Sequence, residues 1–235
     1  MTDAASPAPS APSPAPSAPF SPPARCVRCD EPLASPLVCT TCRTVFPAAA
    51  EYDHFVRFGV ARRYDLDLAD VERRYLVLSR GLHPDQFAGR SREERQLAEQ
   101  LTAHVNDAYA ILRDPMRRAE YLLELEGGPL RAQEKKTPPG FLVEMLEANE
   151  RIEEAEGHLD DATRAELDTM RAGLRSRRDA ILQEIGKAFS ALPPRPDPPR
   201  PEPVRASALT AIREKLNAAA YLQGLATQIT DLLLR

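Results

Sequence analysis

The placement of proline constrains this chain more than any other feature of its sequence. Proline cannot continue a helix and pushes the residue before it out of the helical region. Residues 48–128 contain only Pro84 and Pro115, whereas the run PPRPDPPRPEPV at 193–204 contains seven prolines. That run favours an extended polyproline connector. The proline-poor stretches are free to form long helices.

Helical patterns fill these stretches. The expected helices cover residues 52–58, 68–80, 91–112, 116–125, 140–156, 160–190 and 206–234. Within 160–190, apolar side chains recur at steps of three, four or seven residues, at Leu167, Met170, Leu174, Ile181 and Ile185. In the last expected helix the apolar stripe moves to a different side of the helix near residues 221–224. Either a kink in the helix or a second packing face would produce this change. Outside the cysteine segment, no run of residues alternates between apolar and polar side chains as a β-strand would. We therefore predict that the rest of the protein is all-α.

Changes in composition divide the chain. Residues 1–24 are almost entirely Ala, Pro and Ser and have too little to bury to offset their ordering entropy, so we expect a disordered tail. The interruptions EGGPL at 126–130 and KKTPPG at 135–140 indicate a boundary. The predicted segments are a tail (1–24), a four-cysteine knuckle (25–50), a first helical domain (51–126), a linker (127–138) and a C-terminal helical bundle (139–235).

Charge and hydropathy exclude several classes of protein. The net charge is −4 and the pI is near 5.7, so no global field draws the chain onto nucleic acid or an anionic membrane. No apolar run approaches the ~18 residues that span a bilayer. The opening lacks the basic and apolar regions of a secretory signal and the arginines of a mitochondrial transit peptide. We therefore expect a cytoplasmic protein with reduced thiols and neither nucleic-acid nor membrane partners.

The four cysteines have metal-ligand spacing. Cys26, Cys29, Cys39 and Cys42 form C-x2-C, nine residues, then C-x2-C. Two such turns supply four thiolates, which suit one tetrahedral, structural zinc ion per chain with no position left for substrate. An iron or iron–sulfur site and a metal-free knuckle remain as alternatives. Few basic residues lie nearby, so a scaffolding role is favoured over nucleic-acid binding.

The run SRGLHPDQFAG at 79–89 places His83, Pro84 and Asp85 in a tight loop between two helices. We expect His83 and Asp85 to be exposed. A catalytic dyad needs a concave, partly dry site and a third orienting group, which such a loop does not provide. The triplet also has too few neighbouring ligands for a metal. A docking element and an ordinary turn remain.

The surroundings of this loop resemble a J-domain, the module that activates heat-shock-type chaperone ATPases. The resemblance rests on EYDHFVRFGVARRYDLDLADVERRYLVLSRGLHPD upstream and LTAHVNDAYAILRDPMRRAEYLLEL downstream. More narrowly, FGVARRYDLD and RDPMRRAEYLLEL resemble the iron–sulfur-cluster co-chaperone HscB family, whose eukaryotic form also has a C-x2-C…C-x2-C segment before its J-domain. The resemblance implies a zinc knuckle, a J-domain helical hairpin in 51–126 and a three-helix bundle in 139–235.

This resemblance implies roles for the loop and its neighbours. His83, Pro84 and Asp85 would dock on an HscA-like chaperone ATPase and trigger its ATP hydrolysis, with Arg73, Arg74 and Arg80 as docking charges. Arginines suit this role because they steer encounter with an acidic patch and form charge-assisted hydrogen bonds. The alternative is that these arginines form a solvated helix face interleaved with Asp70 and Glu72.

The helix that opens the C-terminal bundle has a second candidate site. Its core stripe comprises Phe141, Met145, Ala148, Ile152 and Ala155. Outside the stripe, the apolar Leu142, Val143 and Leu146 stand beside the acidic Glu147, Glu150 and Glu154. Such charge-edged patches often mark partner sites, although packing against the J-domain or the connector is the alternative. The resemblance implies that these residues bind an IscU-like iron–sulfur scaffold protein, with Tyr221 as a further contact beside Leu222.

The function that we predict is a non-enzymatic co-chaperone that binds an iron–sulfur scaffold protein and delivers it to a chaperone ATPase. One alternative is a general J-protein with a different client. Another is a zinc-dependent nucleic-acid-binding helical protein, which the acidic charge balance disfavours. The third is an enzyme with a His83/Asp85 site.

Overall fold

Helices account for nearly all regular structure in the computed structural model, which describes residues 25–33, 35–47, 51–195 and 202–234. The elements are α1 (His54–Phe58), α2 (Leu68–Gly81), the short 3-10 helix η2 (Pro84–Phe87), α3 (Arg92–Arg113), α4 (Pro115–Leu125), α5 (Phe141–Glu156), α6 (Asp161–Ser190) and α7 (Pro203–Leu233). The described part contains no strands, only two isolated antiparallel bridges in the cysteine segment. The all-α prediction is confirmed. The predicted tail (1–24) and residues 196–201 of the predicted connector lie outside the described residues.

Local capping explains where the helices begin. The Asp67 carboxylate accepts hydrogen bonds from the first turn of α2. Ser91 and Glu94 form a reciprocal capping box at the start of α3. Asp114 caps α4, whose first residue is Pro115, a position where proline is tolerated. The observed helix limits accordingly fall within three residues of the predicted ones.

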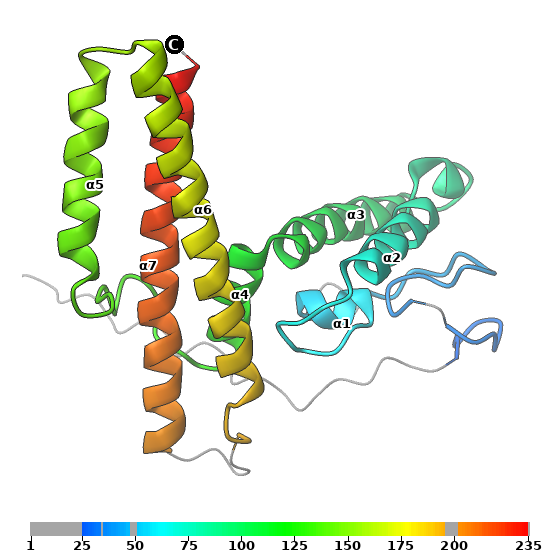
Figure 1. Cartoon of the computed structure of the whole chain (residues 1–235). Helices are drawn as coiled ribbons and strands as arrows, with labels where there is room; N and C mark the ends of the chain where they lie inside the picture. Colours follow the sequence, from blue (N-terminus) through cyan, green and yellow to red (C-terminus); the bar gives the residue numbers. More distant parts are fainter. Residues whose placement is uncertain (1–24, 34, 48–50, 196–201, 235) are drawn as a thin grey trace, which may run out of the picture.

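The helices form two arms (Figure 1). In the first arm, α5, α6 and α7 form a three-helix bundle in which α6 runs antiparallel to α5 and α7. In the second arm, α1, α2 and α3 project sideways from the bundle, with α2 and α3 packed as a hairpin. Helix α4 lies at the junction and packs against both α6 and α7.

Two apolar cores account for the swing of the stripe along α7. The first core gathers side chains from the cysteine segment, from α1–α4 and from the adjoining ends of α6 and α7, including Leu209 and Leu216. The second core joins α5 and α6 to the later part of α7, including Leu222 and Ile229. Helix α7 therefore has two packing faces along its length.

The predicted linker is fixed along α7. The side-chain amide of Asn217 donates hydrogen bonds to the carbonyl oxygens of Glu134 and Lys136, at 3.0 and 2.8 Å. These bonds hold residues 134–136 against α7. Because the first core joins side chains of residues 51–126 to those of α6 and α7, the two arms share interior contacts. The exact division into domains stays a prediction. Among the described residues, no helix is both long and apolar enough to cross a membrane.

Candidate metal centre and docking surfaces

The four predicted metal ligands converge. The sulfur atoms of Cys26, Cys29, Cys39 and Cys42 all lie within 4.8 Å of one another. Cys26 and Cys42 are 3.6 Å apart at sulfur, as are Cys29 and Cys39, and all four thiols are free. Tetrahedral zinc–thiolate geometry requires sulfur–sulfur distances of about 3.8 Å. The donor set therefore fits a four-coordinate metal ion.

The environment of Cys42 favours the deprotonated form that metals bind. A hydrogen bond with the Thr44 hydroxyl, at 3.1 Å, lowers the pKa of the Cys42 thiol to about 6. Two of the four sulfurs, those of Cys26 and Cys39, belong to buried residues. The centre is thus closed by protein ligands, which is typical of structural metal sites.

The His-Pro-Asp loop lies on open surface, as predicted. The His83 side chain is 58% exposed and that of Asp85 is 86% exposed. The backbone N–H of Asp85 donates to Nδ1 of His83, which caps η2, and buried Phe87 anchors the far end of the turn. A general acid–base pair needs an enclosed site. The geometry therefore suits contact with a partner better than catalysis.

The three arginines predicted for docking differ in their surroundings. Arg73 and Arg74 both pair with the carboxylate of Asp70, at 3.1 and 2.7 Å, and Arg74 also donates to the carbonyl oxygen of Phe58. Arg80 is exposed, and within the described residues no carboxylate lies within ion-pair distance of it. Arg74 therefore links α2 to α1, whereas Arg80 is the most available of the three for a partner.

The predicted apolar patch on α5 is exposed. Leu142, Val143 and Leu146, here called the α5 patch, are 59%, 65% and 58% exposed. The predicted core stripe of α5 points inward, with Phe141, Met145, Ile152 and Ala155 buried and Ala148 partly buried. Glu147, Glu150 and Glu154 are exposed on the same helix. The structure thus separates a core face from an apolar face with acidic neighbours.

Tyr221 reaches the same end of the bundle from α7. Its ring packs edge-on against Phe141, with 6.0 Å between centroids, and the residue is 39% exposed. Leu222 is fully buried and belongs to the second core. Of the two adjacent residues, only Tyr221 is therefore available beside the start of α5.

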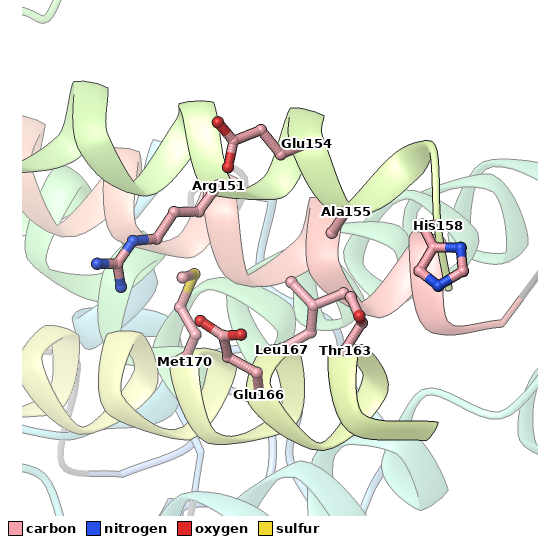
Figure 2. A pocket seen from close by; sticks show the side chains of 8 residues that line it. All are labelled: Arg151, Glu154, Ala155, His158, Thr163, Glu166, Leu167 and Met170. Carbon is pink, nitrogen blue, oxygen red and sulfur yellow. The ribbon is translucent and has the colours of Figure 1, made fainter. Parts of the chain in front are cut away.

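A hollow of about 230 Å³ separates the other ends of α5 and α6 (Figure 2). Arg151, Ala155 and His158 face Glu166 and Met170 across it. Glu154, a predicted site residue, is exposed and also lines this hollow.

Sequence reasoning did not find two residues that connect these features. Arg90 donates to the carbonyl oxygen of Cys42 at 2.8 Å, and Arg213 is buried against Glu120. Arg90 stands just before α3, and Arg213 is one of two arginines in α7. No local signal distinguishes them from their solvated neighbours.

Sequence comparisons place these features among known proteins. A family model described as "HSCB C-terminal oligomerisation domain" matches residues 137–230. An iron–sulfur cluster co-chaperone HscB homologue of Arabidopsis thaliana is 34% identical over 60% of this chain and 54% of its own length. The co-chaperone HscB homologue of Bordetella petrii is 39% identical over 49% of this chain and 68% of its own. The mouse iron–sulfur cluster co-chaperone HscB is 31% identical over 64% of this chain and 62% of its own length.

Two solved structures share the fold. The human co-chaperone HscB superposes with a TM-score of 0.65 at 26% identity, covering 88% of this chain and 96% of that one. The chaperone HscB of Vibrio cholerae superposes with a TM-score of 0.60 at 26% identity, and the match covers 77% of this chain and 96% of that one. The matched relatives and solved structures thus place this helical protein in the co-chaperone class. This chain belongs to the HscB family.

Proposed function

We propose that this protein is a non-enzymatic co-chaperone of iron–sulfur cluster assembly. It binds an IscU-like scaffold protein through the α5 patch and Tyr221, and it stimulates an HscA-like chaperone ATPase through the His-Pro-Asp loop. The observation that carries the proposal is that both surfaces are exposed on separate arms of one molecule. The matches cover 54% and 62% of the Arabidopsis and mouse relatives, which are named as iron–sulfur cluster co-chaperones.

The α5 patch has the chemistry of a protein-binding site. Three apolar side chains at positions i, i+1 and i+4 lie close together on one helix surface. Within the described residues they keep more than half of their surface in contact with solvent, so intramolecular packing does not cover them. Glu147, Glu150 and Glu154 would then surround an apolar contact with charge, as at protein interfaces. A scaffold with an apolar surface edged by basic groups would fit.

Changing Leu142, Val143 and Leu146 together to alanine tests the scaffold site. Calorimetric titration with an IscU-type scaffold should show affinity reduced by about tenfold or more, because clustered apolar anchors dominate small interfaces. The melting temperature should barely change. Met145→Ala, in the buried stripe of the same helix, should instead cost about 2–5 kcal/mol of stability. Val204→Ala is the matched exposed control at the start of α7. Unchanged scaffold binding by the triple variant would remove the proposed client site.

His83→Gln tests the chaperone-docking role. Stimulation of ATP hydrolysis by the partner chaperone should be lost, whereas the melting temperature should hold because the imidazole is largely exposed. His158→Gln changes another exposed histidine, located between α5 and α6, and should leave stimulation intact. Full stimulation by His83→Gln would contradict the assignment of residues 51–126 to a J-domain.

We assign a structural zinc ion to the four-cysteine centre. Four thiolates at mutual distances suited to tetrahedral coordination support this choice, and iron is the chemical alternative. Such an ion would contribute folding energy and no open coordination position. Its place in the proposed function is to hold residues 25–33 and 35–47 against the helices that follow.

A further inference from the structure

The second cysteine turn lies beside the His-Pro-Asp loop. A surface hollow of about 500 Å³ is lined by Thr40 and Arg43 from this turn and by His83 from the loop. Helix α2 contributes Val77, Arg80 and Gly81 to the lining, and η2 contributes Gln86. A metal-binding turn and the loop assigned to chaperone docking thus form one continuous surface.

Close packing holds the turn in this place. Val38 packs so near to Gly81 that a Cβ atom at Gly81 would lie 3.0 Å from its Cγ1. Leu37 and Val38 are buried in the first core together with residues of α1–α3. Arg90, which follows the loop, donates to the carbonyl oxygen of Cys42 at 2.8 Å. The knuckle therefore cannot shift without disturbing the residues on both sides of His83.

The same turn fixes Arg43. Its backbone is in the left-handed region, with φ 60°, and its N–H donates to the carbonyl oxygen of Cys39 at 3.0 Å. A rigid backbone next to Cys42 leaves only the side chain free to move. Binding a partner through Arg43 would thus order its side chain alone and would not require the backbone to be ordered as well.

The charges on this surface are not neutralised internally. Among the described residues, no carboxylate lies within ion-pair distance of Arg43 or Arg80. Val77 on α2 lines the hollow with both arginines and is 45% exposed, and the adjacent Leu76 is 46% exposed. A surface that combines unpaired guanidinium groups with exposed aliphatic side chains fits a partner with carboxylates around an apolar contact.

We propose that the Thr40–Arg43 turn extends the docking surface for the chaperone ATPase, with Arg43 contacting an acidic group of that partner alongside Arg80. This inference rests on the proposed function of the His-Pro-Asp loop and adds a contact from the cysteine knuckle. The knuckle then recognises the chaperone, and the metal ion keeps Arg43 in register with His83.

Arg43→Glu tests this contact, with Arg28→Glu as its matched control. Arg28 lies on the first cysteine turn, is exposed and does not line the hollow, so both variants make the same charge change in the same knuckle. Glutamate and arginine both have a Cβ atom, so the backbone strain at residue 43 stays similar. In the full chain, Arg43→Glu should raise the concentration that gives half-maximal ATPase stimulation about fivefold or more. Arg28→Glu should change it less than about twofold.

Salt dependence and metal content complete the test. Arg43→Gln should make ATPase stimulation less sensitive to added salt, because one charge pair is lost from the interface. Wild-type potency of Arg43→Glu, while His83→Gln is inactive, would overturn the inference and leave the proposed function standing. Failure of the wild-type protein to stimulate the ATPase would instead reject the proposed function. Loss of bound metal by both Arg43 variants would also overturn the inference, because Arg43 would then be structural.

Discussion

The guanidinium group of Arg213 on α7 donates two hydrogen bonds to the carboxylate of Glu120 on α4, at 2.7 and 2.6 Å. Its Nε atom donates to the carbonyl oxygen of Pro129 at 2.9 Å, and the residue is 1% exposed. A buried charge is tolerated when it is paired and its donors are satisfied. This pair links α4, the junction helix, to α7 of the bundle.

Removing the acidic partner should destabilise the protein strongly. Glu120→Ala leaves the buried guanidinium of Arg213 with the Pro129 carbonyl as its remaining partner, and breaking a buried pair in this way costs about 3–5 kcal/mol. Glu184→Ala removes the exposed pair with Lys215 and should cost about 1 kcal/mol or less. Urea denaturation of the two variants measures the difference. Equal small losses would mean that the Arg213 charge is not held in the interior.

Helix α6 packs closely at Gly186 against Tyr64, which lies between α1 and α2 in the second arm. A Cβ atom there would lie 2.8 Å from Cδ1 of Tyr64, so Gly186→Ala forces the helix and the ring apart. Overpacking of this kind costs about 1–3 kcal/mol. On the same helix, a Cβ atom at Gly173 would meet nothing within 4 Å, and Gly173→Ala should stabilise by about 0.5–1 kcal/mol. Thermal melts in which both variants shifted the melting temperature in the same direction would contradict this prediction.

Acid should weaken the fold through His54. Burial, followed by the adjacent Arg57 guanidinium, lowers the pKa of His54 to about 4. The folded imidazole is therefore neutral, whereas the unfolded chain takes up a proton below about pH 6.5. Because the unfolded state binds more protons between pH 4 and 6.5, stability is fully present above this window and falls as the pH falls through it.

The corresponding measurement is urea denaturation at pH 7 and pH 5. His54→Gln should lose part of the difference in unfolding free energy between these two pH values. His158→Gln is the control, because it removes an imidazole that is largely exposed in the folded protein. A pH dependence identical in wild type and His54→Gln would show that other groups cause it.

Removing the metal should affect more than the knuckle. Elemental analysis should find one zinc ion per chain, and Cys39→Ser should lose it. Leu37, Val38 and Val45 share the first core with α1–α3, so we expect a lower melting temperature with most of the helical circular dichroism retained. Val27→Ala lies between two ligands but is 82% exposed, and it should keep both metal and stability. A metal-free wild-type protein prepared under reducing conditions would contradict the zinc assignment.

Several features followed from the sequence because they depend on neighbouring residues. The helix limits are set by capping groups and prolines such as Asp67, Ser91 and Pro115. The exposed face of α5 follows from the helical period, which directs Val143 and Leu146 away from the core stripe that contains Phe141 and Met145. The cysteine spacing predicted a cluster that the structure confirms, because two short turns bring four thiols together whatever surrounds them.

Other features depended on contacts between distant parts of the chain. Arg213 and Glu120 are 93 residues apart, and Arg90 and Cys42 are 48 apart. Whether an arginine is solvated or buried depends on what packs over it, and the sequence pattern around Arg213 resembles that of an exposed helix face. The change of apolar face along α7 likewise has its explanation in the tertiary structure, because this one helix packs against two separate cores. Local backbone preferences determined the elements, and long-range burial decided which charges and faces they enclose.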